Sequence, residues 1–245
     1  MTEIASHRGG AALWPENSET AFRNTAALAV EQIEFDVQLS ADGVPVIFHD
    51  ATLDRVTNGS GPVSTHSLKA LKEFDIFNDG GKIMTLAEGL DILAPTHLVA
   101  RCEIKPGVDL KPYPGLVQKT LDQVADHGMT ERTVITSFHL PTLVEVKAKN
   151  QPLRDLIWLI SDQVIRLTSA AHVAQLACQD GIPSVSPRHT ELRDGALDVL
   201  RNAGLNVGAF AVLEDAAITW SLQAGLDVFT TDRPDAALAI RNARA

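Results

Sequence analysis

Short apolar runs alternate along the chain with longer segments in which apolar residues recur every three or four positions. Each run has the length of a buried strand, and the periodicity that follows most of them is that of one helix face. Eight runs are predicted to be strands: Glu3–Ser6, Ile33–Leu39, Leu98–Lys105, Thr133–Ser137, Leu156–Ile160, Pro183–Ser186, Val207–Val212 and Asp227–Thr231. Eight strand–helix units in 245 residues predict an α/β fold, a closed (β/α)8 barrel.

The junctions between the units indicate parallel strands. Gly181, Gly204 and Gly225 each stand between a helical segment and a strand, at spacings of 23 and 21 residues. Glycine can adopt the left-handed conformation that ends a helix, and the spacing fits one repeat of loop, helix and strand. Thr85 to Glu88 has the pattern of a capping box at a helix start. An open doubly wound sheet is the alternative, but no glycine-rich dinucleotide fingerprint follows the first strand.

One segment departs from the parallel pattern. Asp42-Gly43 is a hairpin-turn sequence between Ile33–Leu39 and a second short run, Val44–Phe48. We therefore expect a TIM barrel with a small hairpin-containing insertion after its second strand. No linker, low-complexity stretch or change of composition divides residues 1–245, which predicts a single domain.

The net charge of the chain limits the kinds of molecule that it is expected to bind. The chain has 21 Lys and Arg against 31 Asp and Glu, a formal net charge of −10. Nucleic acids and anionic membrane surfaces select basic faces, so this balance argues against both. It is compatible with a small phosphorylated substrate held by a cation and a few basic side chains.

The cysteine content and the absence of long apolar runs indicate in which cellular compartment the protein is expected. The two cysteines have no CxxC spacing, which argues against a disulfide framework or a zinc knuckle. A charged and apolar leader is absent from the start of the sequence, and no apolar run approaches the roughly 18 residues of a spanning helix. We expect a cytoplasmic protein without a stable membrane anchor.

Acidic residues share one face of two predicted strands. Side chains alternate across a strand, so Glu34 and Asp36 point to one side and their apolar neighbours to the other. Glu103 and Lys105 share a face at the carboxyl end of the third barrel strand, where barrel active sites lie. Three carboxylates inside a barrel repel one another unless a cation lies between them, and oxygen ligands suit Mg²⁺ or Ca²⁺. The alternative for Glu34 and Asp36 is the solvent-facing side of an ordinary antiparallel strand.

Two histidines directly follow predicted strands. His7 and Arg8 come after the first strand and before two glycines that let a ligand approach the backbone, and His49 ends a short apolar run. Histidines can act as general acid and general base near neutral pH, and the planar guanidinium of Arg8 matches a phosphate group. Lys105 is a candidate for holding a phosphate oxygen or for an internal salt bridge with Glu103. The other six histidines are expected to be structural.

Taken together, these elements resemble the glycerophosphodiester phosphodiesterase family. The matching motifs are His7-Arg8-Gly9, Pro15-Glu16-Asn17-Ser18, Glu34-Phe35-Asp36-Val37, His49-Asp50, Glu103-Ile104-Lys105 and Thr231-Asp232-Arg233-Pro234. The resemblance covers nearly the whole chain and implies a TIM barrel with a small insertion after the second strand.

The resemblance also implies roles for individual residues. The implied metal ligands are Glu34, Asp36 and Glu103, the implied acid and base are His7 and His49, and the implied phosphate contacts are Arg8 and Lys105. Glu16 is implied to lie at the site, whereas Asn17 and Ser18 are expected to cap the first helix.

The seventh strand departs from the family pattern. Phe210 stands where such enzymes usually carry a Trp, and Leu213 stands where an Asn is usual. This difference concerns the alcohol end of the substrate more than the phosphate end, and Phe210 is therefore a candidate substrate contact.

The function predicted from these residues is metal-dependent hydrolysis of glycerophosphodiesters to an alcohol and glycerol 3-phosphate. A metal-dependent lyase or aldolase on the same barrel would explain the carboxylates but not the two histidines with Arg8. A non-catalytic barrel that binds a phosphate ligand is the third possibility, against which the acid–base pair argues.

Overall fold

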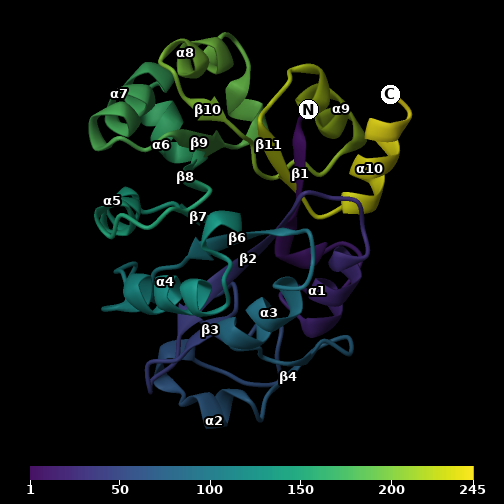
Figure 1. Cartoon of the computed structure of the whole chain (residues 1–245), viewed down its shortest axis with the longest axis vertical. Helices are drawn as coiled ribbons and strands as arrows, with labels where there is room; N and C mark the ends of the chain where they lie inside the picture. The colour runs from purple at the N-terminus through teal and green to yellow at the C-terminus, as the bar shows by residue number, and fades with distance from the viewer. Residues whose placement is uncertain (245) are drawn as a thin grey trace.

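The computed structural model describes residues 1–244, and its centre is a ring of parallel strands surrounded by helices (Figure 1). The strands of the ring are β1 Glu3–Ser6, β2 Gln32–Leu39, β6 Val99–Ile104, β7 Thr133–Ser137, β8 Asp155–Ile160, β9 Ser184–Pro187, β10 Asn206–Val207 and β11 Val228–Thr231. Neighbours in the ring follow the order β10-β9-β8-β7-β6-β2-β1-β11. For seven of the eight predicted strands, the first and last residues in the structure each lie within one residue of the predicted ones.

The remaining strand, β10, is the seventh of the ring in chain order and is irregular. The predicted strand Val207–Val212 is regular only at Asn206–Val207, since Ala211 has a φ of +54°, outside the extended region. Its backbone still bonds to both neighbours. The amide of Ala209 donates to a β11 carbonyl at 3.0 Å, and the amide of Phe210 donates to a β9 carbonyl at 3.1 Å. The (β/α)8 prediction is therefore confirmed, and the open-sheet alternative is wrong.

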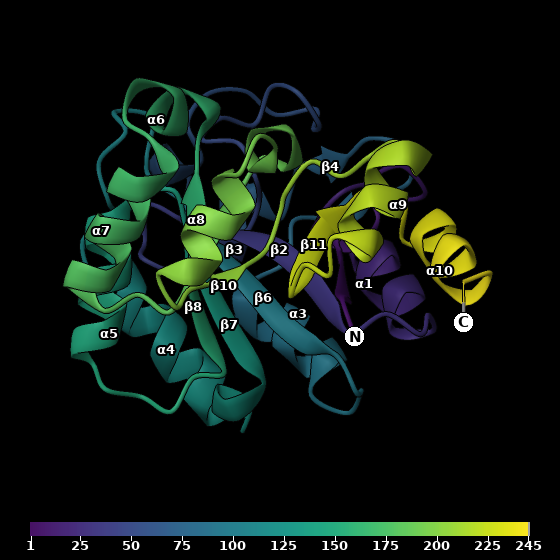
Figure 2. The same ribbon diagram turned by 90° about the horizontal axis from the view of Figure 1, so that it is seen from above.

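Helices cover the outside of the ring, in the connections between its strands (Figure 2). The α-helices of this layer are α1 Glu19–Ala26, α3 Leu86–Leu93, α4 Leu116–Asp126, α5 Leu140–Ala148, α6 Asp162–Leu167, α7 Ala170–Asp180, α8 Ala196–Asn202, α9 Asp215–Gln223 and α10 Pro234–Asn242. Two short 3-10 helices, η3 Thr130–Arg132 and η4 His189–Leu192, lie in the same connections. Among residues 1–244, no helix combines the length and apolarity needed to cross a membrane.

Alternation along the strands divides the core into an outer and an inner part. On β2, Ile33, Phe35 and Val37 are fully buried against the helices, where Phe35 packs on Phe22 of α1 with ring centroids 5.3 Å apart. Inside the barrel, a separate small cluster consists of Ala5, Val99, Val134, Ile157 and Val228. This cluster fills the amino-terminal half of the barrel, so the polar inward residues gather toward the carboxyl ends of the strands.

The insertion after β2 contains the predicted hairpin. Strand β3 Pro45–Ile47 pairs antiparallel with β2, and the turn between them contains Asp42 and Gly43. Beyond β3 come η2 Val63–Thr65, α2 Leu68–Leu71 and a two-stranded sheet of β4 Asp75–Ile76 with β5 Gly81–Lys82. Seven residues form a hydrophobic core of the insertion itself: Val46, Phe48, Leu53, Val63, Leu71, Ile76 and Ile83. The insertion thus packs as a unit beside the carboxyl end of β2.

The predicted capping box stands at the start of α3. The Thr85 hydroxyl accepts a hydrogen bond from the Glu88 amide at 3.1 Å, and the Glu88 carboxylate accepts one from the Thr85 amide at 2.7 Å. Both bonds satisfy amides that would otherwise lack a partner in the first turn of the helix.

Removing this cap should weaken the fold measurably. Replacing Thr85 by Ala is expected to lower the free energy of unfolding by about 1 kcal/mol, measured by urea denaturation. The control Thr85→Ser keeps the hydroxyl and should stay within about 0.5 kcal/mol of the wild type. Equal stability of the Ala variant and the wild type would contradict this role of Thr85.

Candidate active site

A tight turn at the end of β1 presents His7 and Arg8 at the mouth of the barrel. The turn is the 3-10 helix η1 His7–Gly9, in which Arg8 has a φ of +49° and Gly9 a φ of +78°. A Cβ on Gly9 would lie 2.7 Å from the Cβ of Ala21 on α1, so only glycine fits there. The Arg8 amide donates to the Glu34 carboxylate at 3.1 Å, which ties the turn to β2.

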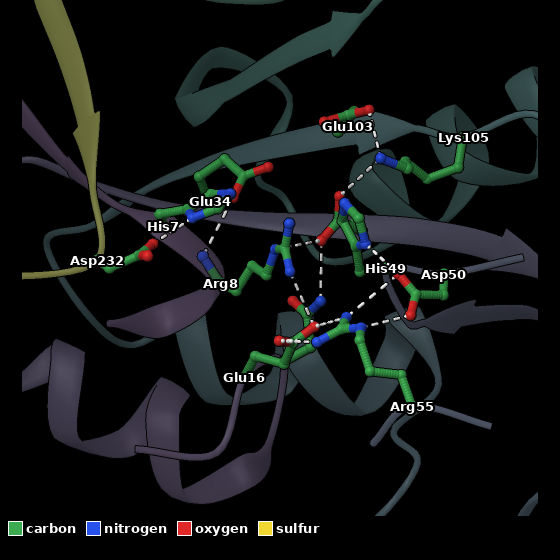
Figure 3. A network of polar contacts seen from close by, with 12 residues as sticks. His7, Arg8, Glu16, Glu34, His49, Asp50, Arg55, Glu103, Lys105 and Asp232 are labelled. Atoms are coloured by element: carbon green, nitrogen blue, oxygen red, sulfur yellow. Dashed lines mark hydrogen bonds and ion pairs between the residues drawn. The ribbon is translucent and has the colours of Figure 1, made fainter. Parts of the chain in front are cut away.

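His7 is held by Asp232, which follows the last strand of the ring (Figure 3). The Nδ1 atom of His7 hydrogen-bonds to the Asp232 carboxylate, and the Nε2 atom lies 3.9 Å from Oε2 of Glu34. Burial by itself would lower the pKa of His7, but the Asp232 bond and the Glu34 charge raise it above its ordinary value. The ring is thereby oriented, with Nε2 directed at the carboxylates.

Three carboxylates meet inside the barrel, as the strand alternation predicts. Glu34 and Asp36 on β2 and Glu103 on β6 are all buried, and one oxygen from each lies within 4.8 Å of the others. Burial and the charge of Asp36 raise the pKa of Glu34 to about 7. Burial also opposes ionisation of Asp36, but Lys105 and other neighbouring cationic groups hold its pKa well below the ordinary value. Crowded oxygen donors of this kind fit a hard divalent cation such as Mg²⁺ or Ca²⁺.

Two basic side chains flank the carboxylates. Nζ of Lys105 lies 2.8 Å from Oε1 of Glu103 and 3.5 Å from Oδ1 of Asp36. Nε of Arg8 lies 3.6 Å from Oδ2 of Asp36, and its Nη1 donates to Glu16 at 3.0 Å. The neighbouring carboxylates outweigh burial and raise the pKa of Lys105, so both groups are cations.

The insertion contributes an arginine that the sequence analysis did not identify. Arg55 binds Glu16 with two nitrogens, at 2.8 and 2.7 Å, and donates through Nε to Asp50 at 2.6 Å (Figure 3). Asp50 in turn lies 2.5 Å from Nδ1 of His49. This chain of contacts orients His49, and Glu16 connects it to Arg8. Arg55 lies in an irregular loop, where no sequence periodicity indicates the direction of its side chain.

Asn17, which was expected to cap the first helix together with Ser18, instead contacts the active site. Ser18 caps α1 as predicted, since its side chain accepts a hydrogen bond from the Ala21 amide. Asn17 does not cap the helix. It has a φ of +56° and donates from Nδ2 to Asp36 at 2.9 Å, inside the site. The positive φ turns its side chain toward the barrel, which a capping pattern in the sequence does not reveal.

The family model of the glycerophosphoryl diester phosphodiesterases matches residues 7–236, a range that begins at His7 and includes each of the active-site residues described in the preceding paragraphs. The chain belongs to this family. Its reaction class is that of a phosphoric diester hydrolase, and the resemblance seen in the motifs is confirmed.

Individual relatives agree with the family match. A glycerophosphodiester phosphodiesterase of Caldanaerobacter subterraneus is 36% identical over 152 residues, which are 60% of this chain and 62% of the relative. One from Bacillus altitudinis is 27% identical over 98% of both chains. A crystal structure from Agrobacterium tumefaciens, assigned provisionally to the glycerophosphoryl diester phosphodiesterases, is 36% identical, covers 100% of this chain and 98% of its own, and has a TM-score of 0.96.

In this phosphodiesterase the polar groups line one side of a cavity of about 250 Å³. His7, Arg8, Glu34, His49 and Glu103 form that side. The other side is more apolar and is formed by Phe138, Leu159, Phe210, Ala211 and Leu213, so both residues of the divergent seventh strand line the cavity. A wider depression of about 600 Å³ lies at the opposite end of the barrel, around Glu3 and Asp227, away from the histidines and the carboxylate cluster.

Arg101 forms part of the cavity wall and was not predicted. It stands on β6, two residues before Glu103, and is 1% exposed. None of its three guanidinium nitrogens has a hydrogen-bond partner among the described residues, and the Thr136 hydroxyl beside the same cavity also lacks one. Such a lining suits bound water or a polar ligand. Because side chains two residues apart on a strand share a face, Arg101 points inward with Glu103. The alternation along this strand could therefore have predicted the inward position of Arg101 from the sequence.

Cation binding by the three carboxylates should depend on pH. The pKa of Glu34 near 7 means that this group is mostly protonated below that pH, and a cation must then displace the proton. The affinity for Mg²⁺ or Ca²⁺ should therefore fall with decreasing pH, by up to roughly tenfold per unit below pH 7, measured by titration calorimetry. Glu34→Gln should bind more weakly and lose most of this dependence. An affinity that does not change between pH 8 and pH 6 would contradict the coupling.

Proposed function

We propose that this phosphodiesterase hydrolyses glycerophosphodiesters to an alcohol and glycerol 3-phosphate, and that the reaction requires a divalent cation held by Glu34, Asp36 and Glu103. The observation that carries the proposal is the buried carboxylate cluster, which lies between two oriented histidines and two cationic side chains. Family membership supplies the reaction class. A structure from Oleispira antarctica, 22% identical, was determined with the product sn-glycerol-3-phosphate.

The carboxylate cluster supports the cation requirement. Its three oxygens are crowded and buried. Among the described residues only a few groups offset the charge of Asp36, chiefly Lys105, His49, Arg8 and Asn17. When bound, the cation would neutralise negative charge that builds on the phosphoryl oxygens. The chemistry of the donor set, all carboxylate oxygen, favours Mg²⁺ or Ca²⁺ over softer metals.

The basic residues would position the phosphate. Nε of Arg8 is buried and has no hydrogen-bond partner within residues 1–244, and Lys105 has three N–H donors for its two carboxylate neighbours. Both can donate to phosphoryl oxygens while they remain in contact with the carboxylates. Charge-assisted bonds of this kind orient the diester and stabilise charge that develops in the transition state.

The histidines would transfer the protons. In both His7 and His49 a carboxylate engages Nδ1, which leaves Nε2 to act on the substrate. One ring takes a proton from the nucleophile, a water molecule or a substrate hydroxyl, and the other gives a proton to the leaving oxygen. Asp232 and Asp50 act through these rings as positioning residues.

We further propose that the substrate is a small, soluble diester. We also propose that the enzyme is a single-domain cytoplasmic protein. The net charge of −10 supports such a substrate over nucleic acid or an anionic membrane surface. The cavity of about 250 Å³ suits a small molecule.

Removal of the metal should abolish the reaction. Glycerol 3-phosphate released from glycerophosphoethanolamine can be measured with a coupled dehydrogenase assay before and after treatment with EDTA. Activity should disappear with EDTA and return with Mg²⁺ or Ca²⁺, since the carboxylate cluster would lose its cation. Full activity in EDTA would rule out the metal requirement.

Each histidine should be essential for turnover. His7→Ala and His49→Ala are each expected to lower kcat/KM by roughly 100-fold or more, because a general acid or base is lost. His172→Ala is the control, since His172 is exposed on α7 and should leave the rate unchanged. A decrease of less than a few-fold would remove that histidine from the mechanism.

A further inference from the structure

The apolar side of the cavity contains one charged residue, Arg188. It follows β9 directly and lines the same cavity as His7 and Glu103. Its guanidinium carbon lies 5.5 Å from the ring centroid of Phe210. Phe210 meets Phe138 edge to face, with ring centroids 5.5 Å apart and an interplanar angle of 79°. This wall is therefore an aromatic pair with a cation already at the face of one ring.

Arg188 is anchored in a way that keeps its terminal nitrogens available. Its Nε donates to both carboxylate oxygens of Asp162, at 2.8 and 3.1 Å. Its Nη1 and Nη2 atoms make no hydrogen bond to another residue between 1 and 244, and the side chain is 40% exposed. The planar fork is thus held in place by one edge while its other donors remain free.

The chemistry of this wall discriminates between head groups. A quaternary ammonium such as choline prefers open aromatic faces, but here a guanidinium lies near the face of Phe210 and repels a second cation. A free guanidinium fork instead matches the geometry of a carboxylate or a phosphate. Under the proposed function, Arg8 and Lys105 hold the phosphate of the diester on the polar side of the cavity. The glycerol part is neutral, so a second anionic group that meets Arg188 has to come from the leaving alcohol.

We infer that Arg188 makes this enzyme selective for glycerophosphodiesters whose leaving alcohol carries a second acidic group, a carboxylate or a phosphate. The inference rests on the proposed function and specifies its substrate class. Arg188 serves as a specificity-determining contact, and Asp162 positions it.

A matched pair of substrates tests the inference. Glycerophosphoserine and glycerophosphoethanolamine differ only in the carboxylate, and kcat/KM for each is measured by release of glycerol 3-phosphate. The wild-type enzyme should prefer the serine diester by roughly 10-fold or more, as a charge-assisted hydrogen bond contributes. Arg188→Gln should bring the ratio of the two kcat/KM values close to one, and Arg188→Lys should give an intermediate ratio because it keeps the charge but loses the fork.

Arg166→Gln is the matched control. Arg166 lies on α6, is itself exposed and pairs with the carboxylate of Glu191, and it is not among the residues that line the cavity. The ratio and both rates should therefore match the wild type. A parallel assay with a diester whose leaving alcohol carries a phosphate monoester determines which anion Arg188 prefers, and a preference for either over ethanolamine supports the inference.

Three results would overturn the inference, and they are distinguishable. Hydrolysis of the ethanolamine diester at a rate equal to or above those of the anionic diesters would refute the selectivity and leave the proposed function intact. A ratio unchanged by Arg188→Gln would equally exclude Arg188 as its source. Absence of turnover with every diester, in the presence of Mg²⁺ or Ca²⁺, would overturn the proposed function and the inference together.

Discussion

Glu34, Asp36 and Glu103 place three carboxylates inside the barrel, with their oxygens within 4.8 Å of one another. Charges buried this closely repel, and the surrounding structure is arranged around that repulsion. Lys105 neutralises one side of the cluster, and Arg8 and Asn17 contact Asp36 from the other. Burial, together with the charge of Asp36, still raises the pKa of Glu34 to about 7, so these residues do not fully offset the cost of ionising all three carboxylates. That remaining cost is the physical reason to expect a divalent cation there.

The site also depends on the seam where the ring closes. His7 after β1 bonds to Asp232 after β11, so the first and last strands of the barrel together orient one catalytic candidate. The second, His49, depends on the insertion, because Arg55 holds Asp50 and Glu16 in a single network. The regular barrel supplies the carboxylates, whereas the irregular segments at its carboxyl end supply the groups that aim the histidines. Polar chemistry is thus concentrated where eight strand ends converge.

The two sides of the cavity differ in character. The polar side is built from the motifs shared with the family, and the apolar side contains Phe210 and Leu213, where this chain departs from the family pattern. Arg188 adds a cation to that apolar side, beside Phe210. Under the proposed function, the residues assigned to the phosphate and those assigned to the alcohol therefore lie on separate strands of the barrel.

Much of this could be predicted from the amino-acid sequence, because it depends on short-range periodicity. The strand and helix alternation, the hairpin at Asp42-Gly43 and the capping box at Thr85 are local patterns, and the structure contains each of them. Alternation along β2 and β6 also placed Glu34, Asp36 and Glu103 on inward faces, and the same rule applied to Arg101. The family resemblance added the pairing of these residues with His7 and His49.

Only the tertiary structure decided the contacts of Asp232, Arg55, Asn17 and Arg188. Those residues lie in loops or at irregular strand ends, where side-chain direction follows from backbone torsion and from distant partners. Asp232 is 225 residues from His7, and no periodic pattern connects positions that only barrel closure brings together.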